Sequence, residues 1–175
     1  MNRHIKKVAV LGSGIMGSRI ACHFANIGVE VLLLDIPPRV SEEGDGGETI
    51  IAQTKAVRNQ IVDQALQAAV KANPSPVFTK KVLNRITTGN FEDDMKEIAG
   101  CDWTIEVVVE NLEIKKRIYD QVEMYRRPGT LISSNTSGIP IHLMAEGRSD
   151  DFRAHFCGTH FFNPPRYLRL LEIIP

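Results

Sequence analysis

The sequence has no excess of either charge, no long apolar run and few cysteines. Lysine plus arginine (21 residues) equals aspartate plus glutamate (21 residues), and this balance argues against nucleic acid or an anionic membrane as a partner. No apolar run approaches the ~20 residues of a membrane-spanning helix, and the first one begins at Val8, which leaves no room for a signal peptide. The three cysteines, Cys22, Cys101 and Cys157, form no CxxC pair, which favours reduced thiols. We therefore predict a soluble protein of the cytoplasm.

What the sequence does contain is an alternation of short apolar segments with helical patterns. Seven segments are typical of strands: residues 8–11, 31–34, 85–88, 102–109, 130–134, 154–161 and 168–174. Helices are predicted after the glycines near residue 14 and over 50–72, 77–83, 112–125 and 139–145. Such alternation predicts an α/β fold of the Rossmann type, with a doubly wound and mainly parallel sheet. The pair 50–72 and 77–83, separated by "NPSP", predicts a helical hairpin inserted after the second strand, and the acidic segment 41–49 predicts a loop.

The strongest motif is "LGSGIMGS", in which Gly12, Gly14 and Gly17 form a GxGxxG pattern directly between a predicted strand and a predicted helix. In this context the first glycine permits a tight turn, the second lets a pyrophosphate approach the backbone, and the third lets helix and strand pack closely. The first helical residues, Ile15 and Met16, offer unpaired N–H groups to phosphate oxygens. The alternative is a glycine turn that packs tightly and binds no ligand.

An acidic residue stands where a dinucleotide site needs one. Asp35 ends the next predicted strand, 18 residues after Gly17, and its carboxylate can accept hydrogen bonds from both ribose hydroxyls. A carboxylate at this position would repel a 2′-phosphate. The motif therefore predicts NAD rather than NADP as the cofactor, although the same pattern also occurs in proteins that bind FAD.

Two further polar segments follow predicted strands. Glu110 and Asn111 end the strand predicted over 102–109 and precede a predicted helix that carries Lys115. The segment "ISSNTSGIP", which contains Ser137, ends another strand. The carboxyl ends of parallel strands form the edge where open α/β sheets bind ligands. The alternatives are a helix cap for Glu110, a solvated face for Lys115 and simple turn formation for Ser137.

The C-terminal segment "GTHFFNPPRYLRLLEIIP" places one carboxylate in an apolar strand. If the prolines turn the chain so that the last strand runs antiparallel to the preceding one, a loop centred on Arg166 sets His160 opposite Glu172. Residues directly opposite share a face of the sheet, with Cβ atoms ~5 Å apart, so the carboxylate can fix the imidazole tautomer and leave its other nitrogen as a base. A purely structural His–Glu pair is the alternative. No metal site is predicted, because His155 and Cys157 share one strand face and His160 points the other way.

These four motifs together resemble the NAD-binding domain of the 3-hydroxyacyl-CoA dehydrogenases, enzymes of fatty-acid β-oxidation. The similarity covers nearly the whole chain, through "VAVLGSGIMGSRIA", "VVVENLEIKKRIY", "SNTSGIPI" and "GTHFFNPPRYLRLLEII". The resemblance implies NAD⁺-dependent oxidation of a (3S)-3-hydroxyacyl-CoA to the 3-oxoacyl-CoA. It implies a catalytic base in His160, an orienting carboxylate in Glu172 and a substrate contact in Ser137. The cofactor contacts that it implies are Gly12, Gly14, Ile15, Met16, Gly17, Asp35, Glu110, Lys115 and Asn163.

The resemblance also implies what surrounds this domain. Residues 1–175 correspond to the NAD-binding domain, and in the family a helical domain follows that closes the substrate cleft and forms the dimer. We therefore expect the isolated chain to bind NAD but to turn over substrate poorly. Pro165-Arg166-Tyr167 depart from the usual family pattern and resemble a long-chain, multidomain branch in which a hydratase domain shares the polypeptide. The alternatives are an NAD-binding module without catalysis and a different two-domain 3-hydroxy acid dehydrogenase with a lysine base in its following domain.

Overall fold

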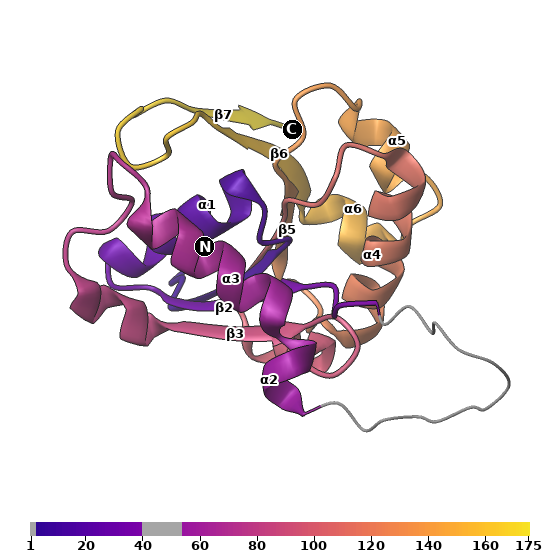
Figure 1. The fold of residues 1–175 in the computed structure, drawn as a ribbon. Helices are drawn as coiled ribbons and strands as arrows, with labels where there is room; N and C mark the ends of the chain where they lie inside the picture. Colours follow the sequence, from indigo (N-terminus) through magenta and orange to yellow (C-terminus); the bar gives the residue numbers. More distant parts are fainter. Residues whose placement is uncertain (1–2, 40–53) are drawn as a thin grey trace, which may run out of the picture.

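The computed structural model describes residues 3–39 and 54–175, and its centre is a seven-stranded sheet (Figure 1). The strands are β1 (Lys7–Leu11), β2 (Glu30–Asp35), β3 (Ile86–Asn90), β4 (Trp103–Glu106), β5 (Leu131–Ser134), β6 (Phe156–Phe161) and β7 (Leu171–Ile174). Their spatial order is β3-β2-β1-β4-β5-β6-β7, and all neighbours are parallel except the antiparallel pair β6 and β7. This confirms the predicted doubly wound α/β sheet, including its antiparallel last strand.

Helices cover both faces of the sheet. They are α1 (Ile15–Asn26), α2 (Lys55–Arg58), α3 (Gln60–Lys71), α4 (Leu112–Tyr125), α5 (Ile141–Ala145) and α6 (Asp150–Ala154), with the 3₁₀-helices η1 (Lys80–Arg85) and η2 (Met95–Gly100). Figure 1 shows α1 and α3 on one face of the sheet and α4, α5 and α6 on the other. None of the helices in the described ranges has the length and apolar character needed to cross a membrane.

The two hydrophobic cores explain why β1 is apolar throughout. Successive residues of a strand point to opposite faces. Val8 and Val10 join the core that contains α1 side chains, whereas Ala9 and Leu11 join the core that contains α4 side chains. All four residues are fully buried. A strand covered on both faces therefore has a continuous apolar sequence rather than an alternating one.

The helical insertion differs from its prediction at the first helix. The helix predicted over 50–72 is divided at Asn59 into α2 and α3. Asn59 is buried, and its Oδ1 accepts a hydrogen bond from Asn90 Nδ2 at 2.8 Å, a tertiary contact that helical periodicity cannot report. The first predicted residues, 50–53, lie outside the described part of the chain, as does the loop predicted over 41–49.

The helix predicted over 77–83 begins three residues later, as the 3₁₀-helix η1. Side chains from elsewhere occupy the backbone groups that a helix would use here. Phe78 N donates to Asn26 Oδ1 at 2.9 Å, and Arg166 Nη1 donates to the Val77 carbonyl oxygen at 3.0 Å. These bonds join residues more than 50 positions apart in the sequence, so a local pattern does not report them.

The strand predicted over 102–109 is shorter than expected, because β4 ends at Glu106. The Glu106 carboxylate accepts a hydrogen bond from Val108 N at 2.7 Å where the chain leaves the sheet, and Val109 is 63% exposed. The prediction that Glu110 ends this strand is therefore wrong. Glu110 follows β4 after a short apolar segment. The helices α6 and η2 are too short for sequence periodicity to predict them.

Candidate functional site

The three glycines of the GxGxxG motif have three different environments. Gly12 has a positive φ of 106°, and a Cβ built on it would lie 2.6 Å from the Val107 carbonyl oxygen. A Cβ on Gly17 would lie 1.8 Å from the Gly12 carbonyl oxygen, so this residue packs directly against the turn. A Cβ on Gly14 would meet no atom within 4 Å. Packing therefore explains the first and third glycines, whereas the second leaves the backbone open to a ligand.

The start of α1 and the end of β2 lie next to this turn. Helix α1 begins at Ile15 with no capping side chain and no acidic residue in its first turn, so its first N–H groups keep their partial positive charge. Asp35 ends β2, and its Oδ2 accepts hydrogen bonds from Ser13 N and Ser13 Oγ at 2.5 Å each. An anion site at a helix start beside a carboxylate at the end of the next strand is the arrangement that fits a dinucleotide.

A cavity of about 490 Å³ lies next to this turn, at the carboxyl edge of the sheet. Its lining residues follow or end β1, β4, β5 and β6, and they are Gly14, Ile15, Met16, Val107, Val108, Val109, Glu110, Asn135, Ser137, His160, Phe161, Phe162 and Asn163. Open parallel sheets bind their ligands at this edge. The structure thus brings most of the predicted site residues to one cavity. The predicted residues outside its lining are Gly12, Gly17, Asp35, Lys115 and Glu172.

His160 and Glu172 meet across the β6–β7 pair, in the register that the sequence predicted. His160 Nδ1 lies 2.8 Å from Glu172 Oε2. The imidazole side chain is 24% exposed and the carboxylate 51% exposed, and His160 lines the cavity. A carboxylate at Nδ1 places the ring proton there, so Nε2 is the nitrogen that can take up a proton from a ligand.

Glu110 connects the segment after β4 to the turn after β5. Its Oε1 accepts hydrogen bonds from Thr136 Oγ1, from Ser137 N at 3.2 Å and from Gly138 N at 3.0 Å. Its Oε2 lies 3.2 Å from Lys115 Nζ. Partial burial disfavours the charged carboxylate, but these hydrogen bonds and the Lys115 charge outweigh burial and lower the pKa of Glu110 to about 2. Glu110 is therefore an anion at neutral pH, and it holds the turn that carries Ser137.

Lys115 lies behind Glu110 rather than on the cavity surface. Its side chain is 1% exposed, so the alternative of a solvated face is wrong. Lys115 Nζ lies 2.8 Å from Glu106 Oε1 and 3.0 Å from Glu106 Oε2. Glu106 is fully buried at the end of β4, and none of the sequence motifs predicted it as a site residue. The available signal was a lone carboxylate in the apolar run "WTIEVVV", the same signal that distinguished Glu172 in its strand.

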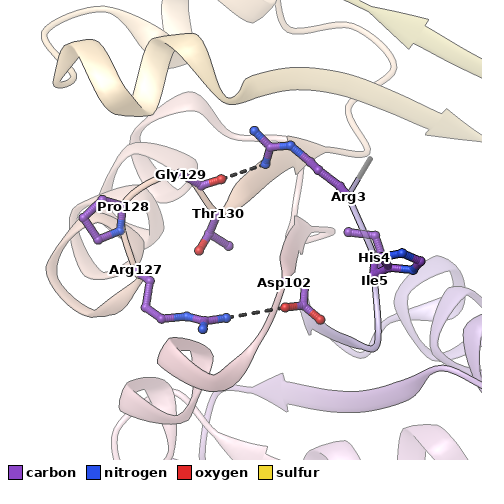
Figure 2. A pocket seen from close by; sticks show the side chains of 8 residues that line it. All are labelled: Arg3, His4, Ile5, Asp102, Arg127, Pro128, Gly129 and Thr130. Carbon is purple, nitrogen blue, oxygen red and sulfur yellow. Dashed lines mark hydrogen bonds and ion pairs between the residues drawn. The ribbon is translucent and has the colours of Figure 1, made fainter. Parts of the chain in front are cut away.

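A second cavity, of about 250 Å³, lies at the opposite edge of the sheet (Figure 2). Its lining residues precede β1, β4 and β5, and they are Arg3, His4, Ile5, Asp102, Arg127, Pro128, Gly129 and Thr130. Figure 2 shows Arg127 reaching Asp102, with 3.4 Å between Nη2 and Oδ1, and Arg3 Nη1 donating to the Gly129 carbonyl oxygen at 2.7 Å. Asp102 Oδ2 also accepts hydrogen bonds from two backbone N–H groups at the start of β1. The predicted site residues do not line this cavity.

Comparison with known proteins identifies relatives of this chain. The chain is 54% identical over 175 residues to a Bacillus subtilis protein named a probable 3-hydroxyacyl-CoA dehydrogenase, and it covers 22% of that protein. It is 41% identical over 174 residues to a Rickettsia felis protein named as a fatty acid oxidation complex trifunctional enzyme, again covering 22% of the relative and 99% of itself. The chain thus spans about a fifth of the length of these two relatives.

The fold agrees with the sequence relationships. The crystal structure of 3-hydroxybutyryl-CoA dehydrogenase from Escherichia coli matches 98% of this chain and 32% of its own, with a TM-score of 0.67 and 27% sequence identity. The model of one protein family, described as "3-hydroxyacyl-CoA dehydrogenase, NAD binding domain", matches residues 7–175. On this match, which extends over nearly its entire length, the chain belongs to the NAD-binding domain family of the 3-hydroxyacyl-CoA dehydrogenases.

Proposed function

We propose that this chain is the NAD-binding part of an enzyme of fatty-acid β-oxidation that oxidises a (3S)-3-hydroxyacyl-CoA to the 3-oxoacyl-CoA. The observation that carries the proposal is the His160–Glu172 hydrogen bond, 2.8 Å long, on a cavity that begins at the glycine turn. An acid–base pair and a dinucleotide site on one edge of a sheet are the parts that oxidation of a hydroxyl group requires. The names of the relatives support the acyl-CoA substrate class and the place in fatty acid oxidation.

The residues around the turn would hold the adenosine and pyrophosphate of NAD. The groups assigned to this role are the backbone of Gly12, Gly14 and Gly17, the first N–H groups of α1 at Ile15 and Met16, and the carboxylate of Asp35. Glu110 and Asn163, which line the cavity near His160, would contact the ribose and nicotinamide side, with Lys115 acting through Glu110. Bound NAD⁺ supplies the hydride acceptor.

The reaction removes a hydride from C3 of the substrate and a proton from its hydroxyl group. His160 Nε2 takes the hydroxyl proton, because Nδ1 is already engaged in the hydrogen bond to Glu172. The Glu172 carboxylate stabilises the imidazolium that forms. Ser137, on the same cavity wall, donates a hydrogen bond to the substrate oxygen and fixes its position. In the reverse direction the imidazolium returns the proton to the oxygen of the 3-oxo group.

We also propose a role for the parts of the relatives that lie outside the region matched by this chain. We expect those further residues to close the acyl-CoA cleft and to form a homo-oligomer, so that the 175-residue chain binds NAD but turns over substrate slowly. The free cysteines Cys22, Cys101 and Cys157 support the predicted reducing, cytoplasmic location.

Two measurements on the 175-residue chain test the proposal. Titration with NADH, followed by its fluorescence, is expected to show saturable binding, and acetoacetyl-CoA is expected to oxidise the bound NADH slowly. The substitution His160→Gln is expected to lower that residual rate about 100-fold or more, because in this direction the proton donor to the 3-oxo oxygen, a general acid, is lost. Absence of NADH binding would contradict the proposal itself. Turnover typical of a complete dehydrogenase would contradict only the role given to the further residues.

A further inference from the structure

A buried polar cluster lies next to Glu110, and its members do not line the cavity. Its members are 0–1% exposed and come from β4, α4 and β5: Glu106, Lys115, Tyr119 and Ser134. Glu106 is the centre, since its two carboxylate oxygens accept hydrogen bonds from Lys115 Nζ at 2.8 and 3.0 Å, from Tyr119 Oη at 2.9 Å and from Ser134 Oγ at 2.5 Å. The N–H of Val108 completes the set at 2.7 Å.

The groups around Glu106 donate hydrogen bonds to its carboxylate oxygens. The ammonium of Lys115 and the N–H of Val108 can only donate, so the carboxylate oxygens that face them must accept. Burial first of all, and then the neighbouring Glu106 charge, raise the pKa of Tyr119 well above its ordinary value. Tyr119 therefore keeps its proton and acts as a donor to Glu106 as well.

Lys115 links this buried carboxyl group to the cavity wall. An ammonium group has three N–H donors, and three carboxylate oxygens lie within reach: both oxygens of Glu106 and Oε2 of Glu110 at 3.2 Å. Glu106 is fully buried, whereas the Glu110 side chain is 41% exposed. The ammonium thus bridges a carboxylate in the core to one that faces the ligand cavity.

Stability alone does not account for such a pair. Removing two charges from water is costly, and well-packed apolar side chains of similar size commonly give equal or greater stability. What an ion pair adds is a defined position for its members. The Glu106 side chain also contacts the neighbouring strand, because its Oε2 accepts the hydrogen bond from Ser134 Oγ at the end of β5, just before the turn that carries Ser137.

We propose that Glu106 is a positioning residue of the dinucleotide site, acting through Lys115 on Glu110 and through the end of β5 on the turn at 136–138. Loss of its charge leaves Lys115 without its main partner and releases Glu110 from a fixed place on the cavity wall. The expected effect on the affinity for NAD rests on the proposed function. The effect on the position of Glu110 does not, and it can be measured in the absence of any ligand.

The test is the substitution Glu106→Gln in the 175-residue chain, with Asp102→Asn at the opposite edge of the sheet as the matched control. Folding is checked by circular dichroism. In Glu106→Gln the amide resonance of Gly138, which donates to Glu110, is expected to move upfield and its proton to exchange faster, and NADH is expected to bind about tenfold more weakly, the loss of one charge-assisted contact. In Asp102→Asn the Gly138 resonance and the NADH affinity stay at their wild-type values.

A purely structural Glu106 predicts a different result: a lower melting temperature, with the Gly138 resonance and the NADH affinity of the folded protein unchanged. That result would overturn the proposal. If Glu106→Gln does not fold, the wild-type chain supplies the measurement, because the Nζ resonance of Lys115 should shift when NADH saturates the site; an unmoved resonance at saturation contradicts the link. If the wild-type chain binds no NADH, the proposed function fails, and the Gly138 resonance of Glu106→Gln still decides the positioning role.

Discussion

The two edges of the central sheet carry similar side chains and use them differently. At the amino edge, where the parallel strands begin, Asp102 binds two backbone N–H groups and the Arg127 guanidinium (Figure 2). It thereby holds the starts of neighbouring strands together. At the carboxyl edge, the carboxylates of Glu110 and Glu172 hold groups that line a larger cavity: the turn at Ser137 and the imidazole of His160. The charge of a carboxylate therefore does not by itself indicate a binding site: the partners of Asp102 include the backbone at the start of β1, whereas those of Glu110 and Glu172 include the turn at Ser137 and an imidazole on the cavity that begins at the glycine turn.

The largest expected effects come from two substitutions in the glycine turn, at the carboxyl edge, which should differ in their effect on stability and on NADH binding. Gly17→Ala would place a Cβ 1.8 Å from the Gly12 carbonyl oxygen, so we expect a loss of unfolding free energy on the order of 3 kcal/mol or more. Gly14→Ala meets no atom within 4 Å, so the fold should tolerate it while NADH binding weakens about tenfold, since the methyl group obstructs the pyrophosphate. Urea unfolding and NADH titration measure the two effects. Equal stability of the two variants would contradict this assignment.

Asp35 is expected to set the choice between NAD and NADP. Asp35→Asn removes the charge that repels a 2′-phosphate and weakens the contact to Ser13 at 2.5 Å. The ratio of the Kd for NADPH to the Kd for NADH should fall about tenfold, or about 1.4 kcal/mol. Titrations with both reduced dinucleotides give the ratio, and Asp102→Asn serves as the control. An unchanged ratio would remove Asp35 from the ribose site.

The register of β6 and β7 shows how much of the site the sequence predicts. Counting residues across the loop centred on Arg166 places His160 opposite Glu172, and the structure has this pair. The role of Glu106 was not predictable in the same way. Periodicity gives the face of a strand to which a side chain points, but not which residue of a later helix meets it, and the partner Lys115 lies nine positions further on.

The helical insertion shows a second limit of the sequence. Its division at Asn59 depends on Asn90, and the late start of η1 depends on Asn26 and Arg166. Such contacts join residues that are distant in the chain, so they follow from the fold rather than from local preference. The strands were predicted more completely, because burial on both faces of the sheet produces an apolar run that is visible in the local sequence.

The pH dependence of stability should distinguish Glu110 from carboxylates in solvent. Its folded-state pKa of about 2 lies below the ordinary value of 4.5, so its contribution is complete above pH 4.5 and is lost as the pH falls from 4.5 to 2. Because the side chain is 41% exposed, we expect only about 1 kcal/mol after solvent screening. Wild type should exceed Glu110→Gln by this amount at pH 7 in urea unfolding, and the difference should shrink at pH 3. A difference that is the same at both pH values would contradict the assignment.

The amino edge should show the smallest effect. Asp102→Asn removes charge-assisted hydrogen bonds to the start of β1 and to Arg127, at a cost of about 0.5–1 kcal/mol in unfolding free energy. NADH affinity should stay unchanged, because this cavity lies at the opposite edge of the sheet from the glycine turn. A clear loss of NADH affinity in this variant would break the distinction between the two edges.

The most direct test of the central claim is a nuclear Overhauser measurement between NADH and labelled His160 in the 175-residue chain. We expect that, at saturation, the C4 protons of the nicotinamide ring show a cross-peak to the His160 ring protons, and that the peak persists in Asp102→Asn. Saturable NADH binding without any cross-peak to His160 would contradict the claim that the nicotinamide lies beside the His160–Glu172 pair.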